Sequence, residues 1–98
     1  MDVHATLVRV RDDIVGGYPQ GAAVGLNDLI RWIGVSPSQV TEAKSAIGPH
    51  DPEYYCELAM RSDEPDTFAL AVTCAALILR RQLELNPALE QFVRLLPK

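Results

Sequence analysis

A long apolar run in the second half of the chain limits most strongly what it can fold into. From Phe68 to Leu79 every residue except Thr73 is apolar. A helix that is hydrophobic on all sides must be surrounded by other elements, so we expect a buried core helix over residues 67–84. The run is well short of the roughly 20 residues that a membrane-spanning helix needs, and two arginines follow it at once. We therefore expect no contact with a membrane.

Apolar residues at helical spacing predict further helices around this core. A first helix is expected over residues 2–15, although residues 5–11 also alternate somewhat, as a strand would. Residues 16–21 contain three glycines and a proline and are expected to form an exposed linker. Further helices are expected over residues 52–61 and, as an amphipathic C-terminal helix, over residues 87–96. The 98 residues therefore predict a single all-α domain, a compact bundle of about five to six short helices.

The stretch from Gly25 to Gly48 predicts two helices joined by a tight turn. Apolar residues three and four positions apart mark a first helix that ends at Gly34, where a left-handed residue costs little without a β-carbon. Ser36 can then cap a second helix, and Pro37 suits its first position. The apolar residues on which the two helices rest are Leu26, Leu29, Ile30, Ile33, Val40, Ala43 and Ile47.

This pair resembles the helix-turn-helix of phage-repressor-type (Cro-like) DNA-binding proteins. The resemblance covers residues 25–48 and is carried by Leu29, Ile33, Gly34, Val35, Ser36 and Val40. It implies a small DNA-binding transcriptional regulator whose helix 36–47 lies in a major groove. Next to the cap Ser36, the side chains of Ser38, Gln39 and Thr41 would face base edges, and Gln39 could pair with adenine. Lys44 and Arg31 would then hold phosphates.

The charge of the chain keeps a second interpretation open. Residues 1–49 carry five acids and four bases, whereas residues 50–98 carry eight acids and five bases, and the net charge is −4. Proteins that bind DNA usually carry an excess of positive charge. The alternative is an acidic helical protein-interaction module, such as an adaptor, an inhibitor or an immunity-type protein, that does not bind DNA. The residues expected to contact its partner are Trp32, Tyr54, Tyr55, Phe92 and Leu96.

Two features bear on both interpretations. Trp32 either packs against the first or the last helix or serves as a binding anchor, and packing is the expected outcome. Residues 87–96 either cover the hydrophobic core or form a homodimer contact. A homodimer would suit a repressor that reads palindromic sites.

Few residues suggest chemistry. Cys56 and Cys74 lie within apolar helical patterns, which predicts buried free thiols in a reducing compartment. His50, Asp51, Glu53 and Cys56 are the only grouping of possible metal ligands, but their spacing matches no closed zinc pattern. We therefore expect no enzyme, no metal, no cofactor and no small-molecule substrate. No signal-peptide pattern opens the chain, which predicts a cytoplasmic protein.

Overall fold

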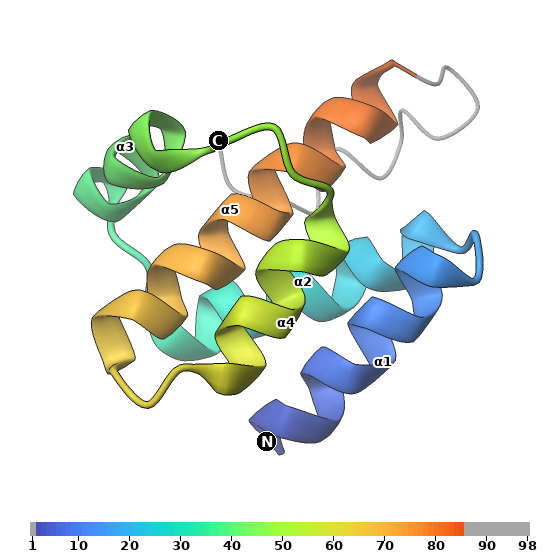
Figure 1. Cartoon of the computed structure of the whole chain (residues 1–98), viewed down its shortest axis with the longest axis horizontal. Coiled ribbons are helices and arrows are strands. Elements are labelled where there is room, and N and C mark those ends of the chain that lie inside the picture. Colours follow the sequence, from blue (N-terminus) through green and yellow to red (C-terminus); the bar gives the residue numbers. More distant parts are fainter. Residues whose placement is uncertain (1, 86–98) are drawn as a thin grey trace.

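The computed structural model describes residues 2–85, which form five α-helices and no strand (Figure 1). In chain order the helices are α1 (Val3–Val15), α2 (Pro19–Ile33), α3 (Pro37–Ala46), α4 (Pro52–Arg61) and α5 (Pro65–Glu84). The predicted all-α bundle is thus confirmed. The helix predicted over residues 87–96, with Phe92 and Leu96, lies outside the described residues.

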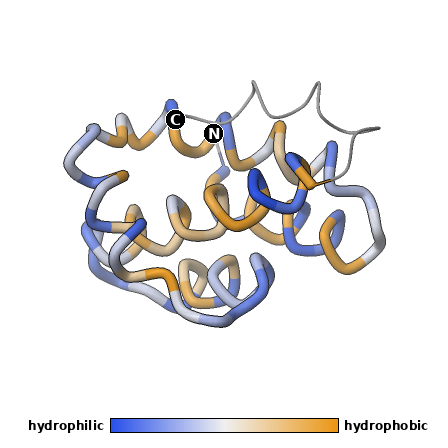
Figure 2. Tube along the Cα trace, turned by 90° about the horizontal axis from the view of Figure 1, so that it is seen from above, coloured by the Kyte–Doolittle hydropathy of each residue, from blue (hydrophilic) through white to orange (hydrophobic). Residues whose placement is uncertain are grey.

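Helix α5 is the centre of the bundle, as its apolar sequence predicts. It packs against α2, α3 and α4, while α1 packs against α2 and α4. Figure 1 shows α5 running diagonally through the molecule with the other helices around it. Figure 2 shows hydrophobic and hydrophilic segments alternating along the helices. Within residues 2–85, no helix has the length and hydrophobicity that crossing a membrane would require.

The start of α5 lies slightly earlier than predicted. Pro65 is the first helical residue and Glu64 precedes it as the cap, whereas we expected the helix to begin at residue 67. Proline suits the first position of a helix because its missing N–H is one of those that the helix leaves unpaired there. Asp66 instead lies in the first helical turn, where a carboxylate interacts favourably with the helix dipole.

Helix α1 confirms the helical interpretation of residues 5–11. Asp2 caps it, since its Oδ1 accepts a hydrogen bond from the Ala5 backbone N–H at 3.0 Å. Leu7 and Val10, three positions apart, are the buried residues of the helix and form its contact with the core.

The prediction of an exposed linker over residues 16–21 is wrong for residues 19–21, because α2 already begins at Pro19. Gly21 and Gly25 lie inside α2, and both approach neighbouring side chains closely. A β-carbon on Gly25 would lie 2.5 Å from Cγ2 of Val10, and one on Gly21 would lie 2.6 Å from Oδ2 of Asp13. Gly25 therefore serves the packing of α1 against α2, and neither glycine forms a turn.

Trp32 is not packed against the first helix as expected, since 58% of its surface is exposed, and the last helix, the other expected contact, lies outside the described residues. Helix α2 contacts the core through one side, whose largest buried residues are Leu26, Leu29 and Ile30. Trp32 follows Ile30 by two positions, about 200° further round the helix. It therefore lies on the side of α2 that faces away from the core.

Candidate functional site

The turn between α2 and α3 has the local geometry that the sequence predicts. Gly34 is left-handed, with φ of 76°, and ends α2. Ser36 and Gln39 then form a capping box at the start of α3. The Gln39 backbone N–H donates to Ser36 Oγ at 3.3 Å, and the Ser36 backbone N–H donates to Gln39 Oε1 at 2.8 Å. Two helices joined by a tight turn are thus present over the predicted residues.

The two helices of this pair are held together through α5. Helices α2 and α3 each pack against α5 rather than closely against one another. Ile30 is buried in the core with 6% of its surface exposed.

The residues expected to read DNA bases already take part in hydrogen bonds within α3. Thr41 Oγ1 donates to the Pro37 carbonyl oxygen at 3.1 Å, and the hydroxyls of Ser36 and Ser38 lie 3.1 Å apart. The Oε1 atom of Gln39 is held in the capping box. A bidentate contact of Gln39 with adenine needs this oxygen as well as the amide nitrogen, so the cap bond would have to break.

Acidic side chains lie near one end of α3 and basic side chains lie near the other. Gln39 and Glu42 of α3 border a hollow of about 210 Å³ together with Asp66 and Leu70 of α5. The start of α3 is therefore close to negative charge.

Near the other end, Lys44 borders a wider hollow of about 540 Å³ with Arg80 and Arg81 of α5. Glu84 lies in the same lining, and its Oε1 accepts from Arg80 Nε at 3.1 Å. The two arginines were not among the predicted site residues, because the sequence marks them only as the end of the apolar run. Lys44 and Arg31, the predicted phosphate contacts, are both exposed.

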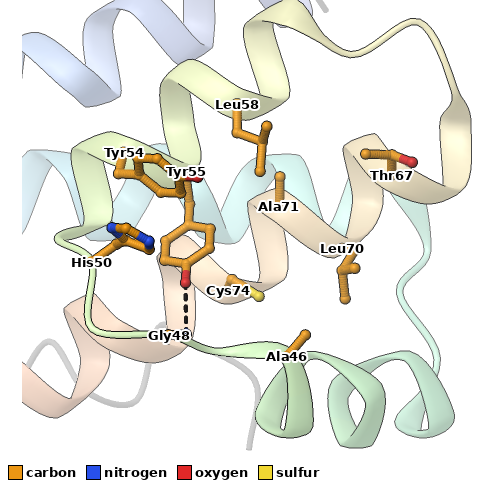
Figure 3. Close-up of a pocket in the computed structure, with 10 residues that line it drawn as sticks. All are labelled: Ala46, Gly48, His50, Tyr54, Tyr55, Leu58, Thr67, Leu70, Ala71 and Cys74. Atoms are coloured by element: carbon orange, nitrogen blue, oxygen red, sulfur yellow. Dashed lines mark hydrogen bonds between the residues drawn. The ribbon is translucent and has the colours of Figure 1, made fainter.

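A third hollow, of about 290 Å³, lies between the end of α3, the turn that follows it, α4 and α5 (Figure 3). We call it the aromatic pocket. Its apolar lining includes Leu58 of α4 and Leu70, Ala71 and Cys74 of α5. The sequence did not predict it, because its residues come from segments that meet only in the folded chain.

Three rings form one wall of the aromatic pocket. The rings of His50 and Tyr54 are stacked with centroids 3.9 Å apart, and the Tyr54 and Tyr55 rings meet edge to face at 5.1 Å. Tyr54 is 39% exposed, whereas Tyr55 is buried. The Tyr55 hydroxyl accepts from the Gly48 backbone N–H at 2.8 Å, which ties the turn after α3 to α4. Of the two tyrosines predicted to contact a partner, only Tyr54 is thus openly accessible.

Both cysteines are free and buried, as predicted. Burial raises the pKa of the Cys56 thiol from 9.0 to about 12, although Arg11 acts in the opposite direction. Burial also raises the pKa of the Cys74 thiol. Both groups are therefore protonated at neutral pH and are poor nucleophiles. Among residues 2–85, no three or more His, Cys, Asp or Glu side chains are grouped as metal ligands would be.

No protein-family model, curated protein or solved structure matches this chain. Three features of the described residues could serve a function. They are the outer face of α2 at Trp32, the surface of α3 with its charged neighbours, and the aromatic pocket.

Proposed function

We propose that this domain is an acidic protein-interaction module that binds a partner through the outer face of α2 around Trp32. The observation that carries the proposal is the 58% exposure of the Trp32 side chain. Trp and Arg are enriched among the residues that dominate binding energy at protein interfaces. Arg31 is exposed beside Trp32, and the exposed Val24 lies two turns earlier on the same side of the helix.

The charges favour a protein partner over DNA. The chain has a net charge of −4, and the polar residues of α3 lie beside Glu42 and Asp66. Carboxylates near a DNA backbone would be repelled by its phosphates. The same carboxylates would attract a basic protein surface and increase the rate of association with it.

The test compares two substitutions of exposed apolar residues. Tagged wild-type protein, Trp32→Ala and Val15→Ala are used to capture binding proteins from an extract, with quantification of each captured protein. Val15 is 66% exposed and lies on α1, so its replacement controls for the loss of apolar surface elsewhere. A hot-spot tryptophan contributes about 2 kcal/mol or more, so Trp32→Ala should weaken the specific partner roughly 30-fold. Equal capture by all three proteins would refute the proposal.

DNA binding is the second candidate function. It is favoured by the capped helix α3 after the Gly34 turn and by the proximity of Lys44 to Arg80 and Arg81. Its test is the fluorescence anisotropy of a labelled mixed-sequence duplex across a salt series. Lys44→Ala and Arg81→Ala should each lower the salt slope by about one, whereas Arg61→Ala on α4 should not. Absence of binding at low salt would exclude this function.

A further inference from the structure

We infer that the aromatic pocket receives an aromatic side chain of a basic partner protein, and that Glu42 and Asp66 hold a lysine or arginine next to that side chain. This inference rests on the proposed interaction function and specifies the chemistry of the partner. It is carried by the size and lining of the pocket and by the carboxylates that adjoin it.

The volume of the pocket suits one aromatic side chain. An apolar cavity of about 150 Å³ in a protein core can hold a benzene molecule. The aromatic pocket measures about 290 Å³, which leaves room for the side chain of Phe, Tyr or Trp and is small for a cofactor. Leu58, Leu70 and Ala71 provide apolar contacts for such a ring, and Figure 3 shows these residues around the hollow.

The aromatic wall favours a ring over an aliphatic group. The planes of Tyr54 and Tyr55 are inclined at 88°, so the wall contains rings in two orientations. Aromatic pairs prefer edge-to-face and offset arrangements, which gain about 0.5–1.5 kcal/mol beyond the burial of area. Tyr54 is 39% exposed, so an incoming ring can cover part of its surface.

The carboxylates next to the aromatic pocket favour a cationic side chain beside the bound ring. Leu70 lines both the aromatic pocket and the hollow bordered by Gln39, Glu42 and Asp66, so the two hollows adjoin at this side chain. Within the described part of the chain, no Lys or Arg lines either of them. A flexible cationic side chain beside the ring can therefore cross Leu70 and reach the two carboxylates.

The experiment uses three acetylated and amidated hexapeptides with the full-length, ¹⁵N-labelled protein. The first is Gly-Gly-Phe-Lys-Gly-Gly, the second has Ala for Phe, and the third has Glu for Lys. Titration by NMR should shift the amide signals of Gly48, Leu58, Ala71 and Cys74 with the first peptide, with a dissociation constant of about 1 mM. The Ala peptide should cause no such shifts, and the Glu peptide should bind more weakly than the first.

Variants of the protein locate the binding site. Ala46 is exposed and lines the pocket, so Ala46→Phe should fill the hollow and abolish the shifts, whereas Ser45→Phe at the exposed neighbouring position should not. Glu42→Gln should weaken binding roughly two- to fivefold, while Glu57→Gln on α4 should have no effect. Equal binding of the three peptides, or unchanged binding to Ala46→Phe, would overturn the inference.

The pocket inference and the proposed function fail separately. If the peptides do not bind but partner capture still depends on Trp32, the pocket inference is wrong and the function of the α2 face stands. If peptide binding follows the expected pattern but capture does not depend on Trp32, the pocket inference stands and the α2 assignment is wrong.

Discussion

Replacement of Gly25 by alanine should destabilise the protein, against the ordinary effect of this change in a helix. Alanine in a helix interior is favoured over glycine by about 1 kcal/mol. At this position, however, the new β-carbon would lie 2.5 Å from Cγ2 of Val10. Carbon atoms in contact are normally separated by about 3.5–4.0 Å, so about 1 Å of separation must be gained.

Val10 cannot make this space cheaply. Its side chain is fully buried and β-branched, which restricts its rotation. Helix α1 must therefore move away from α2, and overpacking of this kind costs about 1–3 kcal/mol. With a cost near the upper end of that range and the gain in helix propensity subtracted, Gly25→Ala should lower the free energy of unfolding by about 1–2 kcal/mol. For a domain of this size, each kcal/mol should lower Tm by roughly 4–8 °C.

The measurement is urea denaturation followed by far-ultraviolet circular dichroism, for the single variants Gly25→Ala and Val10→Ala and for the double variant. Val10→Ala removes the methyl group that the new β-carbon would meet. In that background Gly25→Ala should stabilise the protein by about 1 kcal/mol, which reverses the sign of its effect. If Gly25→Ala increases the stability of the wild-type protein, the steric explanation is refuted.

Three further changes test single interactions. Ser36→Ala should lower the free energy of unfolding by about 1 kcal/mol in urea denaturation, because the Gln39 N–H loses its acceptor, while Ser36→Thr should retain most of the stability. An equal loss in the two variants would contradict the capping role. Tyr55→Phe should cost about 1 kcal/mol and speed hydrogen exchange at the Gly48 amide, whose acceptor it removes; unchanged exchange would argue against this bond. The pKa of Cys56 is raised to about 12, so above pH 9.0 the unfolded chain loses the thiol proton that the folded protein keeps. Stability should therefore fall as the pH rises from 9.0 towards 12, less steeply for Cys56→Ala, and equal slopes would contradict the shift.

Local sequence signals were sufficient for most helix boundaries. Asp2, Ser36 and Pro52 each precede or begin a helix where the sequence predicts one, because caps and first-turn prolines act within a few residues. The positions of Gly21 and Gly25 inside a helix could not be predicted from local signals, because glycine in sequence more often indicates a turn. Their close approach to Asp13 and Val10 depends on α1 lying against α2.

The candidate surfaces were less predictable than the helices. Periodicity identifies the apolar side of α2, but the exposure of Trp32 depends on which helices surround α2. Lys44 and Arg81 are far apart in sequence and meet only because α3 packs against α5. The aromatic pocket likewise depends on the relative placement of three helices, which a pattern of residues along one helix does not contain.

The packing of α3 has a consequence for the motions of the molecule. Helix α3 packs against α5 alone among the described helices, and its buried residues are only Val40 and Ala43. Segments with few buried contacts open at a lower free energy than the rest of a protein, so α3 should exchange its amide hydrogens fastest among the five helices. Ala46, Gln39 and Glu42 of α3 border the two adjoining hollows at Leu70. A ligand bound there would link α3 to α5 a second time and slow this local opening.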